Sequence, residues 1–219
     1  MQLGHWASVA TRREEKRQIG RDAVLDAAER LLRGGATADF SMRDLAVEAG
    51  VSFATPFNQF GSKSAIMQAL SARLIDAMAA RFRASTQADG TVDRVLAMVR
   101  VACDVLLKAP AVNRPIIGSL GAPSPTPGQV SAHSSALWAL ALGGAADMAD
   151  GRSLLARTVM PDQLALCFRG CLSFWGAGEI GDDALPARAR RRRNGAARLR
   201  RCRRPATPAG YPSDLGEDR

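Results

Sequence analysis

The chain has 219 residues, of which 47% are hydrophobic, and it carries a formal net charge of +9. This hydrophobic content is sufficient for a sizeable core and excludes a wholly disordered protein. No apolar run approaches the ~20 residues that cross a bilayer, and the start of the chain lacks the apolar region of a signal peptide. We therefore expect a cytoplasmic protein with no membrane partner.

The positive charge is concentrated near the C-terminal end. Residues 182–219 contain eleven arginines and five acidic residues, whereas the rest of the chain is closer to balance. The overall charge alone therefore does not argue for nucleic-acid binding. The four cysteines form no CxxC pair, and the two histidines lie far from them in the sequence. Because a structural zinc site needs three or four close ligands, we predict no metal site and no cofactor.

The chain begins with a basic segment over residues 1–19, which we expect to be a weakly structured arm. From Arg21 an amphipathic helix follows, and the glycines at positions 34 and 35 are a plausible end for it, because glycine accepts the left-handed conformation found there. The apolar residues that recur at helical spacing in this segment are Val24, Leu25, Ala28, Leu31 and Leu32.

Two short helices come next. Ser41 and Asp44 have the spacing of a capping box at the start of a helix over about 42–49. A glycine and a valine follow as a tight turn. Ser52 is then in place to cap a second short helix, over about 53–59.

The remainder of the chain is also helical in its pattern. Ser62 is predicted to cap a long helix, and Thr91 to cap the next one. Pro110, Pro115 and the proline-rich segment 121–128 predict a loop. Further helices are expected over about 130–149 and 161–179. No segment alternates apolar and polar residues in the manner of a strand, so the predicted fold class is all-α.

Three short helices with a Gly-Val-Ser turn between the second and third are typical of a helix-turn-helix, here over residues 41–60. In such a motif one helix lies across the phosphate backbone while the next enters the major groove of DNA. The turn is short so that the two helices cross steeply while their apolar residues stay packed. The pattern indicates a protein that binds duplex DNA.

Residues 20–67 resemble the DNA-binding domain of the tetracycline-repressor (TetR) family. The resemblance covers about 50 residues and four consecutive elements. It rests on Ala27-Ala28, Gly35, Ser41, Leu45-Ala46, Ala49-Gly50-Val51-Ser52, Thr55, Phe57, Phe60 and Lys63.

The resemblance implies three groups of DNA-binding residues. Ser41 and Lys63 would bind phosphates at helix N-termini, where free N–H groups attract anions. Thr55 and Phe57 would face the DNA backbone from the third helix. Candidates for contact with base edges are Ser52, Phe53, Asn58 and Gln59, of which Asn and Gln suit adenine. Further phosphate contacts are expected from Arg43 and from Arg12, Arg13, Lys16 and Arg17 of the arm.

Three positions depart from the family pattern. Phe57 stands where the family usually has tyrosine, which removes a hydroxyl that would donate to phosphate. Gln59 replaces the usual histidine. Pro56 lies within the short third helix, in its first turn, where the cost should be below the ~3 kcal/mol of a proline in a helix interior. These departures affect the prediction of which bases are read, and they leave the predicted fold unchanged.

By the same resemblance, residues 20–80 form the DNA-binding domain, and residues 81–187 form a helical regulatory domain with a ligand pocket and a dimer interface. The expected protein is a homodimer on a palindromic operator. It would be released by a small-molecule effector, for which the apolar residues suggest a hydrophobic or aromatic compound. Repression is the default expectation, and activation stays open.

The C-terminal segment 188–219 leads to an alternative. Residues 188–204 hold ten arginines and no apolar periodicity, and we expect this Arg/Pro-rich tail to be disordered. Such an abrupt change is typical of a shifted reading frame in GC-rich DNA. A genuine tail would instead support the alternative function of non-sequence-specific nucleic-acid binding. An enzyme is the third reading, and no phosphate loop, metal cluster or nucleophile–base pair supports it.

Overall fold

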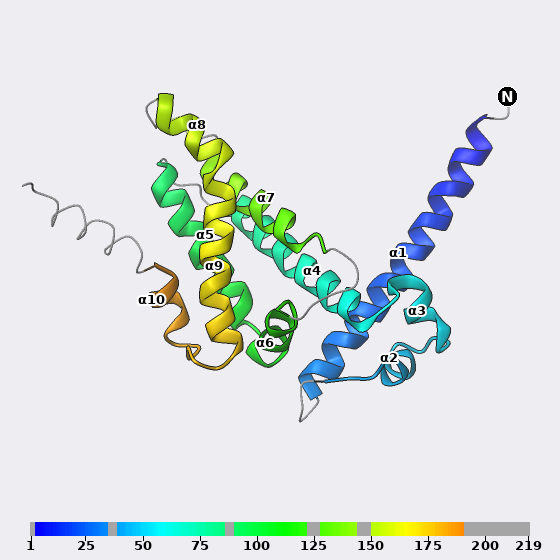
Figure 1. Ribbon diagram of the computed structural model, residues 1–219. Coiled ribbons are helices and arrows are strands. Elements are labelled where there is room, and N and C mark those ends of the chain that lie inside the picture. Colours follow the sequence, from blue (N-terminus) through cyan, green and yellow to red (C-terminus); the bar gives the residue numbers. More distant parts are fainter. Residues whose placement is uncertain (1–2, 35–38, 86–89, 122–127, 144–149, 191–219) are drawn as a thin grey trace, which may run out of the picture.

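The computed structural model describes residues 3–34, 39–85, 90–121, 128–143 and 150–190, without the side chains of residues 3–13, 16 and 150–153 (Figure 1). The described residues form ten helices and no strand, which confirms the all-α prediction. In chain order these are α1 (Leu3–Gly34), α2 (Met42–Glu48), α3 (Ala54–Phe60), α4 (Lys63–Ala84), α5 (Thr91–Leu107), α6 (Pro110–Ser119), α7 (Val130–Leu142), α8 (Asp150–Thr158), α9 (Met160–Gly176) and α10 (Leu185–Arg190).

The first hydrophobic core lies where α1, α2 and the start of α4 meet. The predicted apolar stripe of α1 is buried here, with Val24 and Ala28 fully enclosed. Leu45 of α2 and Ile66 of α4 close the core from the other side, each with no exposed surface. Figure 1 shows α2 and α3 beside the C-terminal half of α1, with α4 leading away from them toward the remaining helices.

The second core is larger and is formed by α4, α5, α7, α9 and α10. Trp138 of α7 and Trp175 of α9 are its largest buried side chains. The helices α7 and α9 lie against each other along most of their lengths. Burying two tryptophans and their apolar neighbours supplies most of the driving force for folding this part of the chain.

Two helices connect the cores. The N-terminal half of α4 contributes to the first core and its C-terminal half, through Met78 and Phe82, to the second. Helix α6 places Val112 and Ile116 in the first core and Ile117 in the second. A change in the packing of α4 or α6 in the second core would therefore also affect the first core, which supports α1 and α2.

Helix α6 corrects one prediction, because Pro110 and Pro115 lie within a helix and not in a loop. Pro110 occupies the first turn, where its missing N–H has no intrahelical partner to lose. Asn113 contributes to the placement of α6, since its Nδ2 donates to the carbonyl of Leu106 at 2.8 Å and satisfies a free group at the end of α5. Tertiary contacts thus keep this segment helical despite its two prolines.

The ends of several helices also differ from the sequence predictions. Helix α1 begins at Leu3, so the segment expected to be a weakly structured arm is helical from that residue. Thr91 is the first residue of α5, and Gly90 is its N-cap. Helix α8 was not predicted, and α7 ends at Leu142, while residues 144–149 of the predicted helix are outside the described part. The tail is also outside it from residue 191.

Candidate functional site

The N-terminus of α2 is held by the predicted capping box. The amide of Asp44 donates to Oγ of Ser41 at 3.1 Å, and the amide of Ser41 donates back to Oδ2 of Asp44 at 3.1 Å. The Ser41 hydroxyl also donates to the same carboxylate at 2.7 Å, and these bonds hold the pKa of Asp44 below its usual value. Ser41 is exposed, but its hydroxyl proton is already used within the cap.

The turn between α2 and α3 depends on Gly50. Its φ of 66° lies in the left-handed region, which suits glycine at the end of a helix. The amide of Val51 donates to the carbonyl of Ala46 at 3.0 Å and closes the turn. This geometry brings the exposed surfaces of α2 and α3 next to each other.

Ser52 does not cap α3 in the way that the sequence predicted. The N-cap residue is Phe53, and no side chain bonds the free amides at this end. The Ser52 carbonyl accepts from the amide of Thr55 at 2.9 Å, while the two side-chain hydroxyls lie 2.8 Å apart. The prediction failed because the chain turns one residue later than expected, so the hydroxyl of Ser52 bonds a side chain in place of an amide.

The exposed surface of α3 is unusually apolar. Phe53 is 57% exposed and Phe57 41% exposed, and their rings form an edge-to-face pair with centroids 5.4 Å apart. Asn58 is exposed beside them, and Pro56 is buried beneath. Large exposed apolar groups on a short helix indicate a surface that contacts a partner.

Phe53 shares a surface hollow with residues of α2. The hollow is lined by Arg43, Ala46, Val47, Val51 and Phe53. Val47 is 78% exposed, and no sequence pattern singled it out as a functional residue. Of the predicted DNA-binding residues, the structure thus brings Arg43 and Phe53 together at one depression.

Gln59 is directed away from this exposed surface. Its side chain packs against α1, where a Cβ atom added to Gly20 would lie 3.0 Å from Nε2 of Gln59. Its Oε1 is buried without a hydrogen-bond partner. The structure therefore separates Gln59 from Phe53 and Asn58, with which it was grouped as a candidate for base contact.

Arg21 of α1 fixes the C-terminal end of α3. Its Nη1 donates to the main-chain carbonyl of Gln59 at 2.6 Å, and its guanidinium lies 4.2 Å from the ring centre of Phe60. A cation over an aromatic face and a charge-assisted hydrogen bond both favour this position. Sequence reasoning missed Arg21, because helical periodicity marks it only as a residue at the edge of the apolar stripe.

Lys63 begins α4, next to the cap formed by Ser62, whose Oγ accepts from the amide of Ala65 at 3.2 Å. The Lys63 ammonium contacts the carboxylate of Asp39 and lies 4.7 Å from the ring centre of Phe40. Partial burial lowers the pKa of Lys63. A phosphate bound here would compete with Asp39 for the ammonium group.

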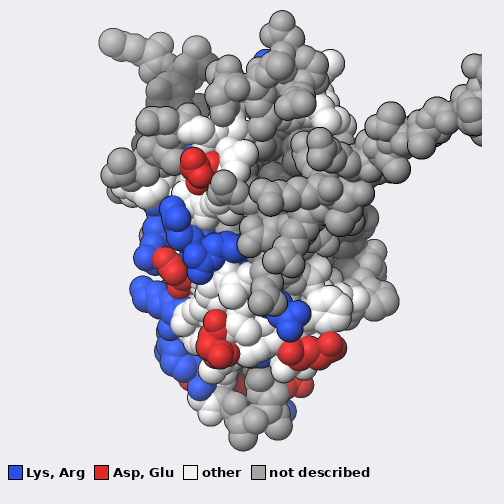
Figure 2. Space-filling view, turned by 90° about the vertical axis from the view of Figure 1, so that its left-hand side faces the viewer, with Lys and Arg blue, Asp and Glu red and all other residues white. Residues whose placement is uncertain are grey.

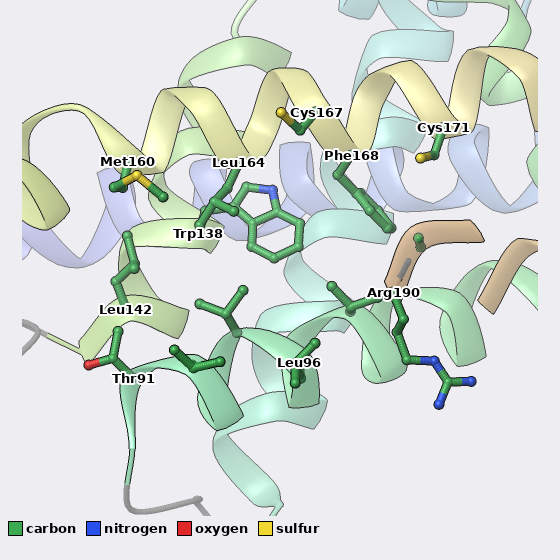
Figure 3. A pocket seen from close by; sticks show the side chains of 14 residues that line it. Thr91, Leu96, Trp138, Leu142, Met160, Leu164, Cys167, Phe168, Cys171 and Arg190 are labelled. Atoms are coloured by element: carbon green, nitrogen blue, oxygen red, sulfur yellow. The ribbon is translucent and has the colours of Figure 1, made fainter. Parts of the chain in front are cut away.

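A pocket of about 410 Å³ lies between α5, α7, α9 and α10 (Figure 3). Thr91 lies at one end and Arg190 at the other, and the Arg190 guanidinium points away from the cavity. The indole of Trp138 projects into the centre. The rest of the lining is mainly apolar and comprises Val92, Val95, Leu96, Val99, Leu142, Met160, Leu164, Cys167, Phe168, Cys171 and Ala189.

Figure 2 shows the end of the molecule that contains α5, α8 and α10. Basic side chains gather along one edge of this face, with acidic side chains among them. A shallow hollow between α4, α5 and α10 is lined by Arg81, Arg100 and Arg190 together with Asp104. Arg81 and Asp104 approach to 3.5 Å, so part of the positive charge is balanced locally.

The described residues offer no group of three His, Cys, Asp or Glu side chains that could hold a metal ion. None of the described helices combines the length and the apolar character that crossing a membrane requires.

Comparison with known proteins gives matches of two different kinds. Residues 24–70 match the sequence profile of the family described as bacterial regulatory proteins, tetR family. The structure is similar to that of a TetR transcriptional regulator from Rhodococcus sp. RHA1, with a TM-score of 0.62 and 22% sequence identity. The match covers 80% of this chain and 93% of the other, and at this identity it shows a shared fold. No curated protein sequence matches the chain.

Proposed function

Since this chain belongs to the tetR family of bacterial regulatory proteins and is a DNA-binding regulator, we propose that it is a ligand-responsive repressor acting in the cytoplasm. The observation that carries the proposal is the surface of α3. Phe53 and Asn58 are exposed there, next to Arg43 of α2 and across a turn that suits a helix-turn-helix. A helix of this size fits the major groove, where side chains reach base edges.

Two kinds of contact would hold the DNA. Arg43 and Lys63 supply positive charge on either side of α3, and the free amides at the N-terminus of α2, next to Ser41, suit a phosphate oxygen. Base recognition then falls to the exposed residues of α3. Asn58 can bond adenine through its amide, whereas Phe53 can contact the 5-methyl group of thymine. Ser52, Thr55 and Phe57 would line the backbone near these bases.

A homodimer is the proposed assembly. Helix α9 exposes Leu166 and Phe174, at 63% and 51%, on the same side and two helical turns apart. Gly170 lies between them with open space around its Cα, so a second helix can approach closely there. Leu154 and Leu155 of α8, the preceding helix, are also exposed, at 60% and 51%. A second copy of the chain is the occupant that would bury these side chains, and two-fold symmetry matches a palindromic operator.

The pocket beside Trp138 is the proposed effector site. Its volume of about 410 Å³ and its apolar walls suit a small hydrophobic or aromatic compound. An effector that binds more tightly to the conformation that does not fit the operator would shift the population toward it. The effector site is close to the DNA-binding helices. Helices α4 and α9 of the second core contact α6, and α6 also packs in the first core.

The experiment that tests the proposal is selection of bound sequences from random duplex DNA. It compares the full-length protein with a chain ending at Arg190, at two salt concentrations. A shared palindromic motif from both proteins is the expected result, and substituting Phe53 and Asn58 should change the motif. Binding without a motif that disappears in the shortened chain would instead assign it to the arginine-rich tail and reject the proposal. In that case a plot of log K against log salt concentration should have a slope of roughly −0.9 for each neutralised phosphate.

A further inference from the structure

Arg169 of α9 is a partly buried cation to which the described residues supply no counter-charge. Its Nη2 donates to the main-chain carbonyl of Ile117 at 3.1 Å, but its Nη1 is buried and makes no hydrogen bond. No carboxylate among the described residues lies within ion-pairing distance of it. Burial lowers the pKa of Arg169. A buried donor of a charged group left without a partner is costly, so a group that accepts from Nη1 would be bound favourably.

Arg169 lines a small space between four helices. A cavity of about 40 Å³ between α4, α6, α7 and α9 is lined by Arg169. Ser71 and Ser134 contribute two hydroxyl groups to its wall, and the remaining lining is mostly apolar. No acidic residue of the described ranges is part of this lining. The space exceeds that needed for one water molecule, which makes room for a small polar group.

The small cavity adjoins the larger pocket described above. Trp138 and Phe168 line both spaces, and their rings form an edge-to-face pair with centroids 5.3 Å apart. Figure 3 shows both side chains projecting from their helices into the larger pocket. The apolar space of about 410 Å³ and the small space lined by Arg169 thus meet at these two rings.

We propose that the protein binds an apolar monocarboxylic acid, whose carboxylate accepts from Nη1 of Arg169 and whose hydrocarbon part lies along Trp138 and Phe168 in the larger pocket. This inference rests on the proposed function, in which that pocket is the effector site. A carboxylate fits the space better than a phosphate, because the space is only about 40 Å³ and a carboxylate is the smaller anion. A neutral ligand would leave the positive charge of Arg169 uncompensated.

The position of Arg169 also connects binding to the DNA-binding end. Nη2 is bonded to Ile117, and the adjacent Ile116 of α6 is buried in the first core. Ser71 belongs to α4, and Leu70 next to it is buried in the same core. A carboxylate that draws Arg169 toward the cavity therefore acts on the two helices that contact both cores.

The test compares acids with neutral molecules of nearly the same shape. Octanoate and 4-phenylbutanoate, each with its primary amide, are titrated into the full-length protein, and affinity is followed by calorimetry and by tryptophan fluorescence. We expect at least one acid to bind, about 10- to 100-fold more tightly than its amide, as for a hydrogen bond to a charged group. The inference would be wrong if neither acid binds, or if acid and amide bind with equal affinity. Measurements on the wild-type protein alone decide this.

Variants then assign the preference to Arg169. Arg169→Gln should remove the acid–amide difference and leave amide affinity unchanged, whereas Arg169→Lys should keep part of it. Arg157→Gln, at an exposed position of α8, is the matched control and should behave as the wild type. A preference that survives Arg169→Gln contradicts the inference. If the acid binds through Arg169 but does not release operator DNA, the ligand site stands and the ligand-responsive function is wrong.

Discussion

The guanidinium of Arg21 lies 4.2 Å from the ring centre of Phe60, and the same group donates to the carbonyl of Gln59 at 2.6 Å. One side chain of α1 thus holds the last turn of α3. The residues of α3 that we propose as base-reading residues lie at its other, exposed side. Arg21 thus contributes to the orientation of this surface relative to the core of α1.

Arg21→Ala is expected to weaken operator binding about tenfold, because an interaction worth roughly 1–2 kcal/mol no longer fixes α3. Affinity is measured by titration of labelled operator at constant salt, together with the melting temperature. Arg33→Ala is the matched control, since Arg33 is an exposed arginine near the end of the same helix. An equal loss in both variants would mean that charge alone, and not the position of α3, determines the effect.

Lys63 provides a prediction about phosphate binding. Lys63→Gln should lower the affinity for all sequences alike and reduce the magnitude of the salt slope by about 0.9, the effect of one phosphate contact. Lys108→Gln, an exposed lysine after α5, should change neither quantity. Asp39→Asn should increase affinity, because Asp39 contacts the Lys63 ammonium in the unbound protein. A salt slope unchanged by Lys63→Gln would remove Lys63 from the interface.

Phe53 provides a prediction about base recognition. Replacing single thymines of the selected operator by deoxyuridine removes one methyl group at a time. At one position of each half-site this should lower affinity about fourfold, as expected for burial of one such group. The Phe53→Ala variant should bind thymine and uracil operators equally, whereas Phe57→Ala should keep the difference. If no thymine position is sensitive in the wild type, Phe53 does not read methyl groups.

The local signals that predicted the DNA-binding end were caps and turns. Ser41 and Ser62 cap α2 and α4 as expected, and Gly50 has the positive φ that a turn after a helix requires. These features depend on residues within a few positions of each other, so the sequence contains enough information to identify them. The same holds for the buried stripe of α1.

The features that could not be predicted depend on tertiary contacts. Pro115 indicated a loop, yet packing of α6 against both cores keeps it in a helix. Gln59 looked like a base-reading residue, but the absence of a side chain at Gly20 lets it pack against α1. Nothing in the sequence singles out Arg169, whose partial burial depends on the positions of α4, α6 and α7. Contacts between residues far apart in the chain determine all three outcomes.

Asp182 provides a prediction about acid stability. Its Oδ1 accepts from Nε1 of Trp175 at 2.8 Å and from Nη2 of Arg114 at 2.7 Å, and these two bonds lower the pKa of Asp182 below 3.8. Because the folded pKa is below the unfolded value, this stabilisation is present above about pH 4 and is lost as the pH falls through the folded pKa. The bonded carboxylate therefore contributes to stability at neutral pH.

Asp182→Asn should accordingly lower the melting temperature at neutral pH and make the further decrease between neutral pH and about pH 3 smaller than in the wild type. Thermal unfolding followed by circular dichroism measures both quantities. Asp183→Asn is the control, since neither Trp175 nor Arg114 bonds that carboxylate in the structure. Identical acid dependence in the wild type and Asp182→Asn would contradict the prediction.

Cys103 provides a prediction about thiol reactivity. It has no exposed surface, and burial raises the pKa of its thiol to about 11. At pH 8 only about one thousandth of such a thiol is ionised, and the thiolate is the reactive form. Iodoacetamide at pH 8 should therefore modify Cys171, which is half-buried at the pocket wall, well before Cys103. Mass spectrometry of the two peptides measures the rates, and unfolding in urea should make them similar. Fast labelling of Cys103 in the native protein would show that the second core opens readily around α5.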